Sequence, residues 1–312
     1  ESQNIPFSGA SFYNQCRIHQ GFHYPRSAYT IYQSIMGFEK FIGEYSSAVS
    51  NIKKNWYLVK KDSLVNREQY LAVMDSFSLK YKESKNPPSF IKNKQDFELS
   101  ILTSEFSVNL KKLKKIILER INSKIHLNHK IINVDAENGN LYTNEKKYGE
   151  YDCIINCTYN NPNLGLCDLT QFKLKYELAA ILYAKTNLSS NDAVTIMDGP
   201  FVSVYPADNM YHTVSSVIHT PFMKFGNHKD FVKIFDNRFE LAKKNKIDLK
   251  IIEHAKKFID INIYDDSLWV SGKTKIKTDK GDSREVLVRR NKKVISVLGG
   301  KLDAIYEAKR KV

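Results

Sequence analysis

The 312-residue chain lacks the long apolar runs and the dense cysteine spacing that define two large classes of protein. No apolar stretch approaches the roughly 18 to 20 residues that a membrane-spanning helix needs, so we expect no membrane span. The four cysteines form no disulfide framework. Cys153 and Cys157 could form a metal pair on one side of a strand, but no further ligands follow at zinc spacing. We therefore expect buried free thiols, no metal site and a reducing, cytoplasmic location.

The sequence also lacks a helix with a dedicated basic face. The formal net charge is +14, from 48 basic and 34 acidic residues, which invites a nucleic-acid interpretation. However, the lysines are spread along the whole chain in pairs such as Lys53-Lys54 and Lys243-Lys244. We therefore expect a small-molecule substrate and no nucleic-acid partner. Attraction of an anionic substrate remains an open alternative.

The most distinctive stretch that is present is residues 8–27, which follows neither a helical nor a strand period. It opens with the small residues Ser-Gly-Ala-Ser, which allow a backbone to approach a ligand closely. Amide and guanidinium groups follow, which satisfy phosphate and carbonyl oxygens. His19 and His23 could act as a base or contact a ligand, or they could be satisfied histidines of a buried loop. Arg26 could clamp a carboxylate or form a surface salt bridge.

Two further segments suggest a ligand site. Residues 294–298 predict a strand that leads through Gly299-Gly300-Lys301 directly into a helix, whose free backbone N–H groups favour an anion. Tight packing is the alternative explanation for the glycine pair, and the spacing is not that of a Walker loop. Residues 151–157 form a continuous apolar run, typical of a parallel strand buried on both faces, and Thr158 follows it.

The remaining sequence predicts a mixture of helices and strands. Helical spacing marks residues 28–50, 104–123 and 228–263, with Ser104 as the cap of the second helix and Glu105 in its first turn. Short strands are expected at 125–127 and 130–134. Residues 166–222 read as antiparallel strands separated by tight turns.

These segments resemble the FAD-dependent oxidoreductases of the D-amino-acid oxidase superfamily. Residues 19–24, His-Gln-Gly-Phe-His-Tyr, are similar to the His-x-Gly-x-Tyr-Tyr of its 2-hydroxyacid dehydrogenase branch. Asp282-Ser-Arg-Glu285 with the later Gly-Gly-Lys-Leu looks like the C-terminus of flavin-dependent glycerol-phosphate dehydrogenases. No Gly-x-Gly-x-x-Gly fingerprint occurs. Glu1 stands at the spacing of the family's ribose-binding glutamate, so we expect the first β-α-β unit to lie upstream. The alternative is a mature, processed protein that never had this unit.

The resemblance implies a mixed α/β fold with two interleaved domains. An incomplete, Rossmann-like FAD-binding domain would comprise residues 1–27, 104–165 and 266–312. An antiparallel-sheet substrate domain would comprise residues 28–103 and 166–265.

The resemblance also implies roles for individual residues. The cofactor-binding residues would be Glu1, Ser11, Asn14, Gln15, Arg17, Ile131, Thr158, Gly299, Gly300 and Lys301. His19, His23 and Arg26 would be catalytic. The expected reaction is hydride transfer from a CH–NH or CH–OH group of an amino acid or hydroxy acid to flavin N5, with an unknown electron acceptor. The alternative is a non-catalytic relative that acts as a binding or structural subunit.

Overall fold

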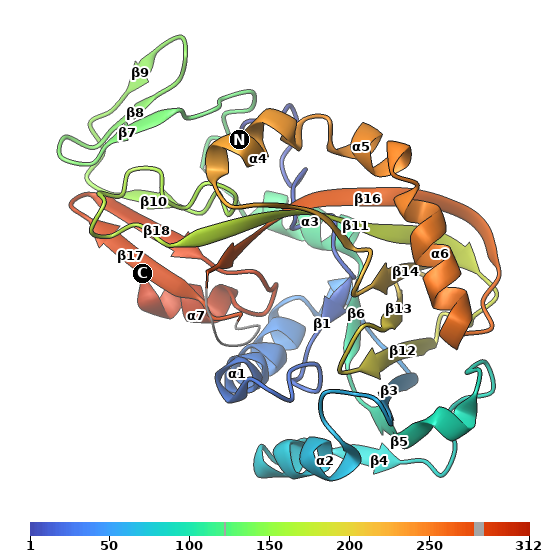
Figure 1. Cartoon of the computed structure of the whole chain (residues 1–312). Helices are drawn as coiled ribbons and strands as arrows, with labels where there is room; N and C mark the ends of the chain where they lie inside the picture. Colours follow the sequence, from blue (N-terminus) through green and yellow to red (C-terminus); the bar gives the residue numbers. More distant parts are fainter. Residues whose placement is uncertain (122, 278–283) are drawn as a thin grey trace.

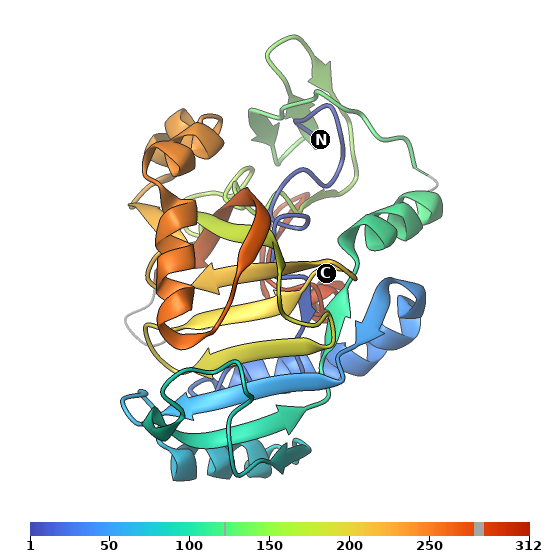
Figure 2. The ribbon, with the colours of Figure 1, turned by 90° about the vertical axis from the view of Figure 1, so that its right-hand side faces the viewer.

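The computed structural model describes residues 1–121, 123–277 and 284–312. Within them, nine strands form one large sheet in the order β15-β11-β14-β13-β12-β3-β5-β4, with β16 paired to β11 (Figures 1 and 2). These strands are β3 (Lys54–Lys60), β4 (Tyr81–Glu83), β5 (Phe97–Thr103), β11 (Leu174–Thr186), β12 (Asp192–Met197), β13 (Val202–Pro206), β14 (Tyr211–Ser216), β15 (Pro221–Phe225) and β16 (Ile263–Ile276). β3 and β12 pair in parallel, and the other pairs are antiparallel. The antiparallel strands expected within residues 166–222 are confirmed.

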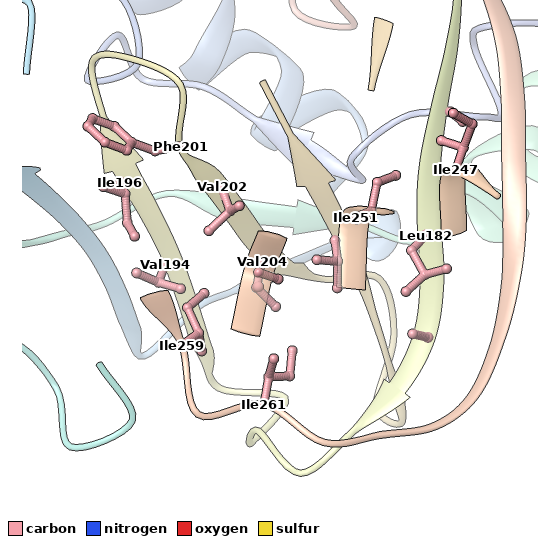
Figure 3. Packing of buried hydrophobic residues seen from close by; sticks show 14 of the residues in the cluster. Leu182, Val194, Ile196, Phe201, Val202, Val204, Ile247, Ile251, Ile259 and Ile261 are labelled. Atoms are coloured by element: carbon pink, nitrogen blue, oxygen red, sulfur yellow. The ribbon is translucent and has the colours of Figure 1, made fainter. Parts of the chain in front are cut away.

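The helices of the described residues are α1 (Ala28–Glu44), α2 (Arg67–Ser76), α3 (Leu110–Arg120), α4 (His228–Phe235), α5 (Arg238–Lys244), α6 (Ile247–Phe258) and α7 (Ile305–Lys311), with single 3-10 turns at Ser46–Ala48 and Lys94–Asp96. Some of them cover the two faces of the large sheet. On one face, Ile247 and Ile251 of α6 pack with Val194, Val202 and Val204 of the sheet (Figure 3). A second core cluster joins α1 and α2 to the other face, through residues such as Ile31, Tyr57 and Tyr70.

Three small sheets carry the remaining strands. β1 (Arg17–Ile18), β6 (Phe106–Val108) and β2 (Val49–Asn51) form the first, and β7 (Asn133–Asp135), β8 (Asn140–Tyr142) and β9 (Lys147–Tyr148) form the second. β10 (Ile154–Asn156), β18 (Val294–Leu298) and β17 (Leu287–Asn291) form the third, in which β10 and β18 run parallel. The mixed α/β character expected from the sequence is confirmed.

The helix expected at 104–123 is shorter, because strand pairing takes its first residues. Residues 106–108 form β6 between β1 and β2. Asn109, not Ser104, caps α3, since its Oδ1 accepts from Lys112 N at 3.0 Å. The expectation for 125–134 was also wrong in part, because only residues 133–135 pair as a strand there. The expected helical run at 228–263 consists of three helices, broken at Asn237 and at Lys246 with its φ of 51°.

The strand expected at 151–157 is confirmed only for residues 154–156 and is not buried on both faces. Ile155 is 52% exposed, because β10 pairs only with β18 among the described residues and one of its faces is uncovered. Cys153 and Cys157, which flank β10, are exposed for the same reason. Cys167 is also exposed, so the expected burial of the thiols is confirmed for Cys16 alone. All four thiols are free.

The turn after β18 also differs from expectation. α7 begins at Ile305, four residues after Lys301, so the glycine pair is not itself a helix start. The boundary expected between residues 265 and 266 falls inside the continuous strand β16, and the division into two domains remains a prediction. In the described part of the chain, no helix is long and apolar enough to cross a membrane.

Candidate functional site

A cavity of about 1500 Å³ is lined by every residue that the sequence analysis singled out as catalytic or cofactor-binding. The loop around Asn14 and the turn at Gly299 and Gly300 are some 280 residues apart in sequence but share this cavity. Their role at the site remains a prediction. Of the motif at 282–285, Asp282 and Ser283 lie outside the described residues, while Arg284 lines the cavity.

Asn14 shapes the first cavity-lining loop. Its Nδ2 donates to Ser11 O at 2.9 Å and Ala10 O at 3.3 Å, and its Oδ1 accepts from Cys16 N at 2.9 Å. These bonds support the left-handed backbone of Cys16, whose φ is 54°. A Cβ on Gly9 would meet no atom within 4 Å, so the backbone there is open to a ligand. The amide of Gln15 is engaged elsewhere, since its Nε2 donates to Ser215 Oγ.

Arg17 lies in a buried polar network. It donates to Tyr57 OH at 2.8 Å and to Thr195 Oγ1 at 2.5 Å, and its guanidinium stacks on Tyr205 at 4.5 Å. Its Nε lies 3.6 Å from Glu105 Oε2. The guanidinium is therefore oriented by protein groups on several sides. Burial disfavours its charged form, but Tyr57 and Glu105 outweigh this effect and raise the pKa of Arg17.

Glu105 is the partner that the sequence analysis missed. It is completely buried and accepts from Tyr57 OH at 2.7 Å and from the backbone N–H of Gln20 at 2.7 Å. The latter bond ties the histidine-containing loop to the sheet. No local signal marked it, because the helical spacing of residues 104–123 placed it in the first turn of a helix.

His19, His23 and Tyr24 form a compact aromatic group at the cavity. The ring centroids of His19 and His23 are 5.0 Å apart, and those of His19 and Tyr24 are 5.3 Å apart. Burial, then the charge of Arg17, lowers the pKa of His19 well below its ordinary value. Its Nδ1 has no hydrogen-bond partner among the described residues. His19 is thus a neutral imidazole with unused hydrogen-bonding capacity in a cavity wall.

Arg26 forms a bidentate pair with Asp198. Nε and Nη2 lie 2.5 Å and 3.2 Å from the two carboxylate oxygens. The Arg26 side chain is 47% exposed, whereas that of Asp198 is 15% exposed. This pair joins the loop after Tyr24 to the turn between β12 and β13. Both alternatives from the sequence stay open, since a salt bridge exists and both residues line the cavity.

Lys301 is a buried cation in the cavity wall. Its Nζ donates to Ser34 Oγ at 2.7 Å and lies 3.6 Å from Asp303 Oδ2. It also lies 5.3 Å from the centroid of the Tyr24 ring. Burial lowers the pKa of Lys301, and the carboxylate of Asp303 opposes this shift.

The far end of the cavity is formed by the N-terminal segment and residues 129–131. His129 N donates to Glu1 O at 2.9 Å, and Ile131 lines the same wall. Thr158 is held by Asn156, whose Oδ1 accepts from Thr158 N at 3.1 Å and Oγ1 at 2.8 Å. A Cβ on Gly300 would be in ordinary van der Waals contact with Tyr159, whose hydroxyl oxygen would lie 3.5 Å away. In the described part of the chain, no group of three or more His, Cys, Asp or Glu side chains could hold a metal ion.

No protein-family model matches the chain. A curated relative, the FAD-dependent monooxygenase FPY4 of Fusarium mangiferae, is 27% identical over 97% of this chain and 80% of its own. L-alpha-glycerophosphate oxidase from Mycoplasma pneumoniae, solved with FAD bound, superposes with a TM-score of 0.65 at 12% identity, covering 97% and 82% of the two chains. Glycine oxidase from Geobacillus kaustophilus gives 0.61 at 9% identity, covering 98% and 82%.

The chain has the fold of these two oxidases. The resemblance drawn from the sequence motifs is therefore confirmed at the level of the fold. The two superpositions cover 98% and 97% of this chain.

Proposed function

We propose that this protein is an FAD-dependent oxidoreductase that oxidises a CH–NH or CH–OH bond in a small amino acid or hydroxy acid. One observation supports this most strongly. Residues 1–3, 8–11, 129–131, 157–161 and 299–303, which come from five separate parts of the chain, line a single cavity. An elongated ligand with several polar groups fits such a wall better than a compact metabolite does.

The residues present fit FAD. Small-molecule pockets commonly measure about 300–1000 Å³, so a cavity of about 1500 Å³ has room for a dinucleotide and a small substrate together. Gly9 leaves the backbone open at one point, where a ring or phosphate could approach closely. Glu1 and Ile131 would hold the adenosine end, residues 8–15 the phosphates, and Gly300 with Lys301 the flavin end.

Bound FAD would supply the hydride acceptor, and the chain would supply proton transfer and orientation. His19 is neutral and lines the cavity, so it would accept the proton that leaves the substrate nitrogen or oxygen. Arg26 would fix a substrate carboxylate through its planar fork. Lys301 would present positive charge to the buried end of the cavity.

The test starts with the full-length protein and added FAD. After gel filtration, the protein fraction should keep the visible absorbance of flavin, and a panel of amino acids and hydroxy acids should bleach it under anaerobic conditions. A His19→Gln variant should retain FAD but bleach far more slowly. A protein that keeps no flavin would refute the proposal.

The alternative of a non-catalytic relative predicts bound flavin that no substrate of the panel bleaches. The curated relative is named a monooxygenase, which would give an oxygenated product in place of hydrogen peroxide. Admitting oxygen to the reduced protein and assaying both hydrogen peroxide and oxygenated product separates an oxidase from a monooxygenase.

A further inference from the structure

The turn that follows β18 docks closely on one face of helix α1. Thr30, Ser34 and Gly37 lie on this face at helical spacing, and the first two are fully buried. A Cβ on Gly37 would lie 2.3 Å from the backbone oxygen of Asp303, so only glycine allows this approach. The position of Asp303 is therefore fixed by a backbone contact with α1.

The same helix orients Lys301. A lysine ammonium has three donors, of which one bonds to Ser34 Oγ at 2.7 Å and a second faces Asp303 Oδ2 at 3.6 Å. The side chains of Lys301 and Asp303 are 5% and 2% exposed, so solvent screens this pair little. Lys301 also lines the cavity, and its Nζ lies 5.3 Å from the centroid of the Tyr24 ring.

Positive groups from other elements face this ammonium. Arg284 disfavours the charged form of Lys301, and Lys301 in turn disfavours the charged form of His19. Burial raises the pKa of Asp303, the charge of Lys301 opposes this shift, and the charge of Glu105 adds to it. Within the described residues, Asp303 is the carboxylate that forms an ion pair with Lys301.

We propose that Ser34 and Asp303 are positioning residues that hold the ammonium of Lys301 at the cavity wall and limit the positive charge it presents to a bound anionic group. Asp303 compensates most of that charge, while Ser34 fixes the orientation of the ammonium group. The part of this inference that concerns the flavin rests on the proposed function. The part that concerns Lys301 stands on the contacts with Ser34 and Asp303 alone.

The first experiment measures sulfite affinity in the FAD-loaded protein. Sulfite adds reversibly to flavin and bleaches it, and the anionic adduct is favoured by nearby positive charge. At a pH at which Lys301 stays protonated in every variant, Asp303→Asn should tighten sulfite binding by about tenfold, or about 1.4 kcal/mol, because the ammonium is no longer compensated. Asp303→Glu should keep the wild-type sulfite affinity, because it retains a carboxylate at this position. Glu307→Gln removes a carboxylate that pairs with Arg310 and Lys311 in the same terminal segment, and it should change little.

The second experiment needs no flavin. In protein labelled at the lysine ε-carbon, the NMR signal that Lys301→Arg removes reports the titration of Lys301. Asp303→Asn and Ser34→Ala should each lower its pKa, because each removes a group that favours the ammonium. Glu307→Gln should leave it unchanged. If Asp303→Asn does not fold, Ser34→Ala and Asp303→Glu carry the test.

The outcomes separate the two proposals. A protein that binds no FAD but shows the expected lysine titrations refutes the proposed function and supports the positioning role. A titration of Lys301 that neither variant alters overturns the positioning role, whatever the flavin does. Equal sulfite affinity in Asp303→Asn and Glu307→Gln, in an FAD-loaded protein, also overturns the proposed effect on charge.

Discussion

Arg17 and Glu105 form an ion pair whose side chains are 1% and 0% exposed, with Nε 3.6 Å from Oε2. The pair joins β1, which precedes the histidines, to the segment between β5 and β6. Because Glu105 also accepts from the backbone of Gln20, it fixes the entry of the loop that carries His19. A charged pair in the interior thus sets the geometry of the cavity wall.

Breaking this pair should be costly. Arg17→Met leaves the carboxylate of Glu105 buried without its counter-charge, so we expect a loss of about 3–5 kcal/mol in the free energy of unfolding. Urea denaturation followed by tryptophan fluorescence measures it, since Trp56 lies in the neighbouring core. Adding Glu105→Gln should recover part of the loss. Arg120→Met, which breaks the exposed pair with Glu44, should cost only about 0–1 kcal/mol.

Stability should fall in acid partly through His19. Its pKa is lowered in the folded protein, so below about pH 6.5 the unfolded chain binds a proton that the folded protein refuses. Stability is therefore lost as the pH falls through that value toward the folded pKa. His19→Gln should lose less stability than wild type between about pH 7.5 and about pH 5.5. A remaining dependence is expected from His212 and His254, whose pKa values burial also lowers. An equal loss in both proteins would contradict the assignment to His19.

The sequence predicted the antiparallel sheet because clear turns separate its strands. The resemblance to the flavin-dependent family implied that residues 8–27 and the turn at Gly299 would meet at one site, and both segments line the same cavity. The helix expected at 104–123 was too long, since pairing of residues 106–108 with β1 and β2 outweighs local helical spacing.

The sequence could not predict the partners within the cavity wall. Glu105 and Asp303 are recognisable as important only once the fold brings them to Arg17 and Lys301, because nothing local marks an acidic residue as buried. The exposure of Cys153 and Cys157 could not be predicted from the sequence either, because it depends on which face of β10 is covered. Pairings of high sequence separation are fixed by topology rather than by local pattern.

Two glycines of α1 offer a matched test of how closely the helix packs. Gly37→Ala places a methyl group against the backbone oxygen of Asp303, so we expect a loss of about 1–3 kcal/mol in the free energy of unfolding. Gly43→Ala meets no atom within 4 Å and should be neutral or stabilising by up to about 1 kcal/mol. Both glycines lie within α1, so the change in intrinsic helix propensity from glycine to alanine is the same for the two variants. Equal stability of the two variants would show that α1 can shift away from the turn.

The pair Arg26–Asp198 provides a test of substrate recognition. If Arg26 binds a substrate carboxylate, Asp198 competes for the same fork, and Asp198→Asn should lower KM for carboxylate-bearing substrates by about threefold to tenfold. Arg26→Lys should raise KM by about tenfold with kcat little changed, because the planar fork is lost. Steady-state kinetics with the substrate found in the reduction panel measures both.

Stability separates this interpretation from a purely structural one. The Arg26 side chain is half exposed, so both substitutions should change the free energy of unfolding by only about 0–1 kcal/mol. Arg67→Lys, in the exposed pair with Glu83 outside the cavity, is the matched control and should leave KM unchanged. If Arg26→Lys and Asp198→Asn also leave KM unchanged, Arg26 serves only as a salt bridge between the loop and the sheet. The substrate carboxylate would then bind elsewhere in the cavity, where Lys301 is the next cation to test by the same KM measurement.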